Sequence, residues 1–243
     1  MAANNCPCVI EPRKGRNEQC LPGNAVLVFS PEDLASFSAC LPQPPVLTRK
    51  LYLTDLFTAL AGSAPLAIAG PMLGAPQTIL VLEKMIALGA ARFIAVGWCG
   101  SLSARVKIGD IVLPLGAVSE EGTSSHYPEC ECAPSYQLIE LLRPALQSTG
   151  KTIHEGMVWT TDAPFRETCA KVKSFQTQNI LAVDMETSAL FSVARFRGVE
   201  LGVVLVVSDD LSSLKWVHGF RDAGFKQSRQ KVIQSVLTLF SGK

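Results

Sequence analysis

The stretch Leu201–Leu211 (LGVVLVVSDDL) is an apolar run that ends in a serine and two aspartates before Leu211. Such a run predicts a buried strand with a polar turn at its carboxyl end. Five further apolar runs flanked by Gly or Pro predict strands of the same kind, at residues 25–29, 66–69, 93–96, 111–115 and 180–183. The predicted core is therefore a sheet of several buried strands.

Segments with helical spacing of apolar residues alternate with these strands. Thr78–Leu88 follows Pro76, which suits a first helical turn, and ends before Gly89, a residue typical of a helix stop. Three more segments are predicted to be helices, at residues 136–146, 187–196 and 227–240. This alternation predicts an α/β fold in which helices cover both faces of the sheet.

The 243 residues are expected to form one sizeable domain. Residues 1–24 mix Cys, Pro, Asn and charged residues without periodicity, and we expect an irregular N-terminal arm there. The strand and helix pattern then runs from Ala25 onward without a separating linker. Residues 25–243 are therefore predicted to be a single domain.

Composition and charge argue against two classes of partner. The chain has 22 Lys and Arg and 21 Asp and Glu, and its net charge of +1 supplies no attraction to nucleic acid or to an anionic membrane. No apolar stretch approaches the roughly 18 residues of a membrane-spanning helix, and no secretory signal is recognisable. We therefore expect a cytoplasmic protein whose eight cysteines are free thiols.

Three polar turns follow apolar runs, at Gly97–Ser101, Val183–Thr187 and Val207–Leu211. Functional residues of a covered sheet gather in such turns. A single acidic residue after a strand more often caps the next helix. Asp184 and Glu186 flank Met185, however, and a pair of carboxylates with an apolar neighbour suits the binding of paired hydroxyls beneath a sugar ring.

An ordered set of motifs extends through most of the chain. It comprises Gly74-Ala75-Pro76, Glu83–Gly89 (EKMIALG), Val96-Gly97 with Gly100, Gly109–Val112 (GDIV), Val183–Ser188 (VDMETS) and Val207–Leu211 (VSDDL). This set resembles the nucleoside phosphorylase and nucleosidase family, which includes purine nucleoside phosphorylase, uridine phosphorylase and methylthioadenosine/S-adenosylhomocysteine nucleosidase. The resemblance implies a three-layer α/β/α fold with a central mixed sheet, and cleavage of an N-glycosidic bond.

The resemblance also implies roles for individual residues. Glu186 is the expected ligand of the ribose hydroxyls, Met185 is expected to pack under the sugar, and Asp184 stands where the family carries an acidic residue. Asp209 is the expected catalytic residue, because the matching aspartate of the purine enzymes hydrogen-bonds the leaving base, and Ser208 before it is expected to contact the base.

The chemistry favours the same residue types. Glycosidic cleavage builds positive charge on the sugar and negative charge on the departing base, so carboxylates near the sugar and an acid near the base lower the barrier. Asp209 can act as that acid at neutral pH only if burial or a nearby carboxylate such as Asp210 raises its pKa.

Residues 159–168 (WTTDAPFRET) lie where the family carries a base-recognition loop. Phe165 could stack on a base and Arg166 could hydrogen-bond one, although packing of Phe165 on the core is an equal alternative. The Gln-Glu-Arg run typical of uridine phosphorylases is missing. Together with Asp209, this absence favours a purine base.

The expected phosphate ligands of the family are missing. Phe29–Asp33 (FSPED) replaces a Gly-Asp-Pro-x-Arg run, Ala95 replaces an arginine, and Trp98, after Gly97, replaces a Ser or Thr. A phosphate dianion needs positive charge and amide donors. The phosphate or nucleophile pocket is still expected at Gly97, Trp98 and Arg49. Arg49, Lys50 or Arg166 could supply the charge by another route, including across a subunit boundary.

Two cysteine pairs and one histidine are further candidate site residues. Cys6-Pro7-Cys8 and Cys130-Glu131-Cys132 are too closely spaced for a usual structural zinc site, so no metal is expected. His126 could line the pocket, because the family carries a similar Ser-x-His stretch.

Three hypotheses remain open. The first is a nucleoside phosphorylase of purine salvage that forms ribose 1-phosphate, with inorganic phosphate as co-substrate and no other cofactor. The second is a hydrolytic nucleosidase that uses water, and the third is a non-catalytic nucleoside-binding protein. In each, the partner is a small-molecule nucleoside, and a homo-oligomer, either a dimer or a hexamer, is expected from the resemblance.

Overall fold

The computed structural model describes residues 8–127 and 132–241. Within them lies one mixed sheet with the strand order β10-β9-β6-β7-β8-β5-β1-β4-β3-β2. The strands are β1 (Asn24–Val28), β2 (Val46–Leu51), β3 (Thr54–Ala61), β4 (Ala64–Gly70), β5 (Arg92–Ser101), β6 (Ile111–Glu120), β7 (Ile153–Thr161), β8 (Ala182–Asp184), β9 (Glu200–Asp210) and β10 (Val217–His218). All six predicted strands are present.

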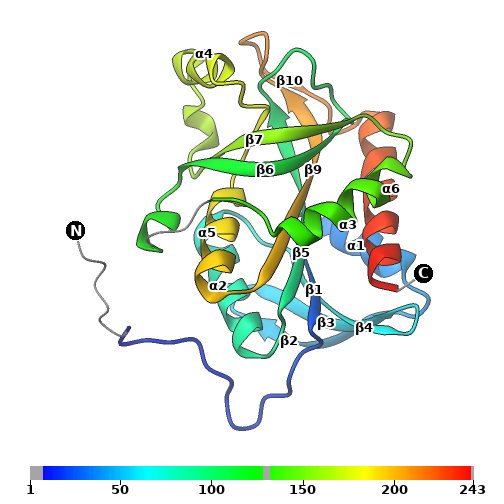
Figure 1. Ribbon diagram of the computed structural model, residues 1–243. Helices are drawn as coiled ribbons and strands as arrows, with labels where there is room; N and C mark the ends of the chain where they lie inside the picture. The colour runs from blue at the N-terminus through cyan, green and yellow to red at the C-terminus, as the bar shows by residue number, and fades with distance from the viewer. Residues whose placement is uncertain (1–7, 128–131, 242–243) are drawn as a thin grey trace.

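One half of the sheet closes on itself. Strand β5 pairs with β8 and also runs parallel to β9, while β9, β6, β7 and β8 follow one another as neighbours. These five strands therefore form a closed ring, and β1, β4, β3 and β2 extend from β5 as an open sheet (Figure 1). The sequence pattern did not predict this closure.

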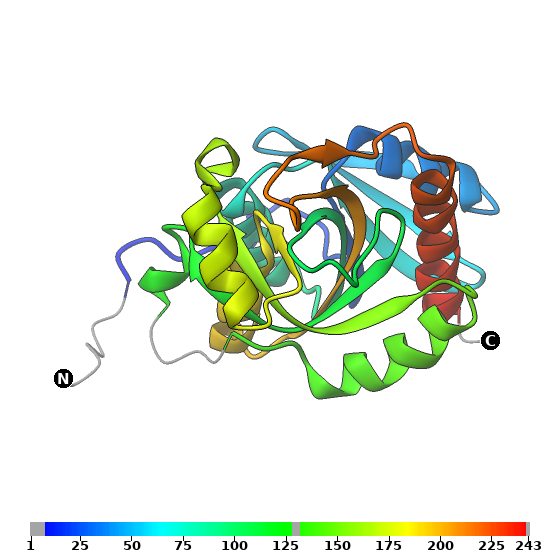
Figure 2. The ribbon, with the colours of Figure 1, turned by 90° about the horizontal axis from the view of Figure 1, so that it is seen from above.

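Helices cover both faces of the sheet. Helices α1 (Pro31–Cys40), α3 (Tyr136–Gln147) and α6 (Ala223–Ser241) pack together on one face, and α2 (Ala75–Ala87) and α5 (Thr187–Arg197) pack together on the other (Figure 1). Helix α4 (Cys169–Thr177) lies apart from both groups, beyond strand β7 (Figure 2). The predicted three-layer α/β/α fold with a central mixed sheet is confirmed.

Each helix layer buries its own apolar core. One cluster joins α2 and α5 to the sheet through residues such as Leu82, Met85 and Leu190, and a second joins α1, α3 and α6 through Phe37, Leu142 and Val232. All six side chains are buried. The apolar stripes of the sequence thus determine which face of each helix meets the sheet.

Six helices and strands were not predicted from the sequence, namely α1, β2, β3, β7, α4 and the two-residue strand β10. Strand β2 and helix α4 bury too few residues to leave a clear apolar pattern. In β2 only Leu51 is buried, and in α4 only Val172 and Phe175 are buried. A capping serine signals α1, because Ser30 Oγ accepts the Asp33 N–H at 3.0 Å and Pro31 occupies the first turn.

Residues 8–23 contain no helix or strand and are mostly exposed, but several of them contact the domain. Leu21 is buried and donates its N–H to Leu88 O at 2.8 Å. Glu18 forms ion pairs with Arg49 and Lys84. The boundary between an arm of residues 1–24 and a domain of residues 25–243 stays a prediction.

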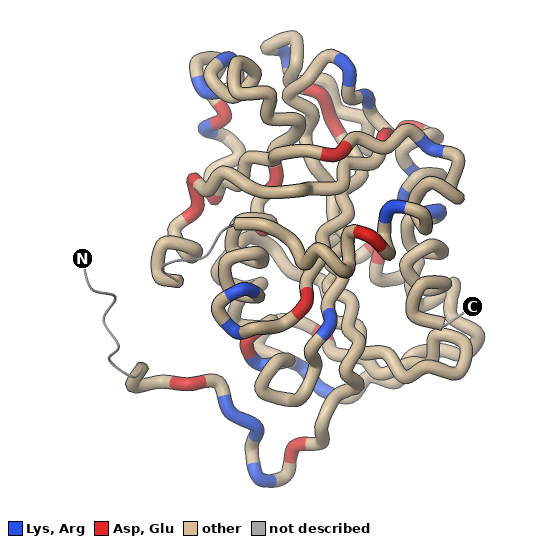
Figure 3. Tube along the Cα trace, in the orientation of Figure 1, with Lys and Arg blue, Asp and Glu red and all other residues tan. Residues whose placement is uncertain are grey.

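Acidic and basic residues are interspersed along the trace (Figure 3). Among the described residues, no helix combines the length and apolarity that a membrane span requires.

Candidate active site

A cavity of about 730 Å³ lies where strands β1, β5, β8 and β9 end. Its lining comprises Phe29, Ser30, Pro31, Glu32, Met72, Leu73, Trp98, Cys99, Gly100, Pro164, Phe165, Glu167, Val183, Asp184, Met185, Glu186, Ser208, Asp209, Leu211, Trp216 and Phe220. The three polar turns selected from the sequence therefore meet in one place. Such convergence at strand ends is the usual setting for ligand binding in α/β proteins.

Glu186 is a buried carboxyl group of this cavity, only 8% exposed. Its Oε1 accepts the N–H of Gly74 at 2.6 Å, which fixes the side chain against the start of α2. Burial, followed by the negative charge of Asp184, raises the pKa of Glu186 to about 8. A carboxyl group in this position can accept hydrogen bonds from hydroxyl groups, and it can donate one when it is protonated.

Asp184, predicted to contact ribose, is engaged by the protein itself. Its Oδ1 accepts from Thr160 Oγ1 at 2.7 Å, and its Oδ2 accepts from Thr187 Oγ1 at 2.6 Å and Thr187 N at 2.8 Å. Asp184 thereby caps the start of α5 and holds the turn that carries Glu186. Burial raises its pKa, and these hydrogen bonds act in the opposite direction. Its contact with a sugar stays a prediction.

Asp209, the predicted catalytic residue, lies at the end of β9 with both carboxyl oxygens occupied. Oδ1 lies 2.6 Å from Ser208 Oγ, and Oδ2 accepts the Trp216 Nε1–H at 2.9 Å. Ser208 Oγ also lies 3.2 Å from Cys99 O. Ser208 thus orients Asp209, a contact that the sequence analysis did not foresee when it assigned Ser208 to the base.

Glu167 is a cavity residue that the sequence analysis missed. It follows the short 3-10 turn η2 (Pro164–Arg166). Burial, and then the negative charge of Asp209, raises the pKa of Glu167 to about 7. Glu167 lies within residues 159–168, the segment expected to recognise the base, and this position could have identified it. The sequence analysis selected Phe165 and Arg166 from that segment instead.

Trp98 lines the cavity and is hydrogen-bonded to one member of a buried ion pair. Its Nε1–H donates to Asp33 Oδ2 at 2.6 Å, and Arg229 Nε donates to Asp33 Oδ1 at 2.6 Å. The Arg229 guanidinium also stacks on the Trp98 ring, 4.5 Å from its centroid. Asp33 is 1% exposed, so the pair is shielded from water.

The cavity lining is acidic. It holds five carboxyl groups, and no Lys, Arg or His of the described chain lines it. Three of those groups, Glu167, Asp184 and Glu186, have raised pKa values, which limits the negative charge at neutral pH. The site is suited to a ligand with developing positive charge and poorly suited, within one chain, to a phosphate dianion.

Aromatic and thioether side chains form the remaining walls. Phe165 is fully exposed at the cavity, and Trp216 is 63% exposed. Met185 lies between Asp184 and Glu186 in the lining. Exposed aromatic rings beside a cavity can stack on a planar base.

Five candidate residues lie outside the cavity lining, namely Gly97, Arg49, Lys50, Arg166 and His126. Gly97 lies behind Phe29, since a Cβ on it would come within 2.7 Å of the Phe29 ring. Arg49 is paired with Glu18 at 2.7 Å, Arg166 is exposed, and His126 is exposed on the turn η1 (Ser124–His126). Their predicted contacts with phosphate, base or pocket stay predictions.

No cluster of three or more possible metal ligands occurs in residues 8–127 and 132–241. Cys6 and Cys130, one member of each cysteine pair, lie outside the described residues.

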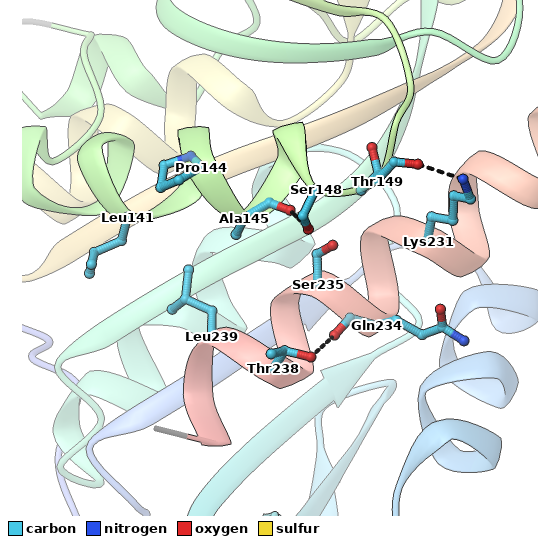
Figure 4. A pocket seen from close by; sticks show the side chains of 10 residues that line it. All are labelled: Leu141, Pro144, Ala145, Ser148, Thr149, Lys231, Gln234, Ser235, Thr238 and Leu239. Atoms are coloured by element: carbon cyan, nitrogen blue, oxygen red, sulfur yellow. Dashed lines mark hydrogen bonds between the residues drawn. The ribbon is translucent and has the colours of Figure 1, made fainter. Parts of the chain in front are cut away.

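A second hollow of about 550 Å³ lies between α3 and α6 (Figure 4). Its one charged lining residue, Lys231, donates to Thr149 O, and Thr238 donates to Gln234 O. Since it holds no carboxylate, cysteine or histidine in its lining, the cavity at the strand ends is the candidate active site.

Comparison with known proteins gives one family match. The family model described as Phosphorylase superfamily matches residues 24–241. A guanosine phosphorylase of Halorubrum lacusprofundi is 32% identical over 148 residues, which cover 60% of this chain and 61% of that protein. A DeoD-type purine nucleoside phosphorylase of Bacillus cytotoxicus is 30% identical over 159 residues, which cover 64% of this chain and 68% of that protein.

Two solved structures share the fold. A uridine phosphorylase from Vibrio fischeri superposes with a TM-score of 0.80 at 21% identity, covering 91% of this chain and 92% of its own. A purine nucleoside phosphorylase from Toxoplasma gondii, in complex with immucillin-H, superposes with a TM-score of 0.82 at 19% identity and covers 91% of both chains.

Proposed function

Because this chain belongs to the Phosphorylase superfamily, we propose that it is a nucleoside phosphorylase that cleaves a purine nucleoside to base and ribose 1-phosphate. In this reaction a phosphate oxygen bonds to C1′ of the sugar, the C1′–N9 bond breaks, and its electron pair leaves with the base. A proton then neutralises the base. The products balance without an oxidant or a metal ion.

The observation that carries the proposal is the placement of Glu186 and Asp209 in one cavity. Glu186 is buried next to Met185 and supplies hydrogen bonds for the ribose hydroxyls. Asp209 and Glu167 lie near the position of the base, where negative charge develops. Phe165 and Trp216 supply aromatic surface against which a base can stack.

The names of the relatives support a purine substrate. Guanosine phosphorylase and purine nucleoside phosphorylase both act on purine nucleosides by their names, and they align with 60% and 64% of this chain. The match covers 61% of the guanosine phosphorylase, which is less than two thirds of its length. The purine substrate is therefore part of our proposal and is tested below.

Phosphate binding requires charge from outside the cavity lining, because the five carboxyl groups there have no cationic partner among the described lining residues. We place this charge on Arg49 and Lys50 of a second subunit in a homo-oligomer. Both lie on strand β2, at the edge of the sheet, where an approaching subunit can meet them. Arg49 would break its ion pair with Glu18 and bind phosphate in its place.

The test is product analysis with inosine, guanosine, adenosine and uridine, each with and without phosphate. Release of base only with phosphate, together with ribose 1-phosphate, supports the proposal. Arg49→Ala should raise the KM for phosphate, while Lys151→Ala, a surface lysine that pairs with Gln227, should leave it unchanged. Absence of base release from every nucleoside contradicts catalysis and favours a nucleoside-binding protein.

Hydrolysis is the second candidate, favoured by the Trp98–Asp33–Arg229 contacts. Trp98 stands where the family carries a phosphate-binding Ser or Thr, and it is hydrogen-bonded to the buried Asp33. Asp33 also binds Arg229, so this arginine is already paired with a carboxylate. Water, which needs no cationic site, could then attack C1′. Base and free ribose formed at the same rate with and without phosphate would establish this reaction instead.

A further inference from the structure

We propose that Trp216 is a positioning residue, whose indole N–H holds the carboxyl group of Asp209 in the orientation from which Asp209 passes a proton to the departing base. The inference rests on the proposed function, since it assigns a step of nucleoside cleavage. It applies to phosphorolysis and hydrolysis alike, because in both reactions the base leaves with the C1′–N9 electron pair.

The carboxyl group of Asp209 is confined by its neighbours. Its Oδ2 accepts the Nε1–H of Trp216 at 2.9 Å, and an indole nitrogen can only donate, so the direction of this hydrogen bond is fixed. A Cβ at Gly100 would lie 3.0 Å from the same oxygen, so the backbone of Gly100 lies close to it. Oδ1 lies 2.6 Å from Ser208 Oγ. Rotation of the carboxyl group would break the contacts with Trp216 and Ser208.

The backbone that carries Trp216 is held against strand β9. Trp216 directly precedes β10, which pairs antiparallel with β9 and places His218 opposite Asp209. The N–H of Gly219 donates to Ser208 O at 2.8 Å. The indole therefore belongs to a short hairpin whose other strand carries Asp209.

A row of aromatic rings holds the indole from the side of the cavity. Trp216, Phe220 and Trp98 all line the cavity. The ring centroids of Trp216 and Phe220 are 6.3 Å apart, and those of Phe220 and Trp98 are 6.2 Å apart, within the range of favourable ring contacts. His218 stacks on Phe220 with an interplanar angle of 7°. Ring contacts thus restrict the position from which Trp216 donates its hydrogen bond.

The two donors leave room for the proton that Asp209 transfers. The carboxyl oxygens have four lone-pair positions, and Trp216 and Ser208 occupy two of them. A proton on one of the others moves to N7 of the purine as the C1′–N9 electron pair moves onto the base and C1′ gains the oxygen of phosphate or water. Asp209 is left as a carboxylate and regains a proton from solvent after the neutral base departs.

The hydrogen bond from Trp216 strengthens during this step. A hydrogen bond to an ionised acceptor is about twice as strong as one between neutral groups. Its acceptor is a neutral carboxyl group before the transfer and a carboxylate after it. Trp216 therefore both fixes the direction of Asp209 and stabilises the charge that develops on it.

The test separates the hydrogen bond from stacking on the base. Trp216→Phe keeps an aromatic ring and removes the N–H. The variant and the parent are compared on inosine and on 7-methylinosine, whose base already carries a positive charge and leaves without a proton from Asp209. Each enzyme is measured at its own pH optimum, so that a change in the protonation of Asp209 does not enter the comparison.

We expect Trp216→Phe to lower kcat for inosine by about 10-fold or more and to change the KM by less than about 2-fold, because the ring is retained. Cleavage of 7-methylinosine should stay at the parental rate, which also shows that the variant is folded. His218→Phe is the matched control in the same hairpin. It keeps a ring beside Phe220, lies outside the cavity lining and should retain the parental kcat on both substrates.

A double variant tests whether Trp216 acts through Asp209. Asp209→Asn has no acidic proton to position, so adding Trp216→Phe to it should cause no further loss on inosine. Equal losses on the two substrates, an unchanged kcat on inosine, or multiplying losses in the double variant would overturn the role of Trp216 and leave the proposed function intact. A parent that cleaves neither substrate would overturn both.

Discussion

The indole Nε1 of Trp98 lies 2.6 Å from the buried Asp33 carboxylate, which also binds Arg229 at 2.6 Å. Three residues from β5, α1 and α6 thus form one shielded group next to the cavity. The sequence identified Trp98 only as a departure from the family pattern. Its hydrogen bond shows that the departure is part of a charged network that ties two helices to the sheet.

Removal of Asp33 should destabilise the protein strongly. Asp33→Ala leaves the Arg229 guanidinium without its partner in a site that is 12% exposed, and we expect a loss of about 3 kcal/mol in the free energy of unfolding. Urea unfolding measures this. Glu120→Ala breaks the exposed pair with Lys171 and should cost less than about 1 kcal/mol. Equal losses in the two variants would contradict the role given to burial.

Gly100 is required by the close packing around Asp209. A Cβ at this position would lie 2.6 Å from Leu211 Cδ1 and 3.0 Å from Asp209 Oδ2. Gly100→Ala should therefore displace Asp209, lowering kcat/KM by about 10-fold or more and stability by about 1–3 kcal/mol. In Gly23→Ala the added Cβ meets no atom within 4 Å, so this control should keep full activity. Wild-type kinetics in Gly100→Ala would refute the prediction.

Glu186 should couple stability to pH. Its carboxyl group is protonated in the folded state up to about pH 8 but has a pKa of 4.5 when unfolded. The folded state binds more protons between these values, so the free energy of unfolding falls as pH rises from about 4.5 to about 8. Glu186→Gln cannot ionise, and its Tm should exceed that of the parent above about pH 8.

The same substitution should reduce activity, because the amide replaces one carboxyl oxygen by an NH₂ group that cannot accept a hydrogen bond from the ribose hydroxyls. We expect kcat/KM to fall by about 10- to 100-fold. Thr177→Val, on the exposed face of α4, is a control that should change neither property. A Glu186→Gln variant with parental activity would exclude Glu186 from sugar binding.

Phe165 should contribute to binding and not to folding. Its side chain is fully exposed at the cavity, so Phe165→Ala should change the free energy of unfolding by no more than about 0.5 kcal/mol. Loss of stacking should raise the KM for the nucleoside by about 3- to 10-fold. Tyr136→Ala removes another exposed aromatic ring, at the start of α3 and outside the cavity lining, and should leave KM unchanged. An unchanged KM in Phe165→Ala would count against stacking.

Apolar periodicity alone determined much of the fold. The runs around Ala25, Phe93 and Leu201 are buried strands, because they have enough apolar side chains to require covering on both faces. Strand β7 escaped prediction, since its first half contains His154, Glu155 and Gly156, and α4 escaped because only two of its residues are buried. A helix or strand with few buried residues has only a weak apolar pattern in the sequence.

Motif order likewise pointed to Glu186, Met185 and Asp209 as neighbours, and the fold brings all three into one cavity. The tertiary structure decided what those residues touch. Asp184 is hydrogen-bonded to Thr160 and Thr187, and Asp209 is hydrogen-bonded to Ser208 and Trp216. The negative charge of Asp209 also acts on the carboxyl group of Glu167. Such contacts join segments distant in the chain, and the pKa of a carboxyl group depends on its burial and charged neighbours. The sequence by itself therefore determined the layers of the fold and the identity of the acids, and only the folded chain decided which acid retains a proton.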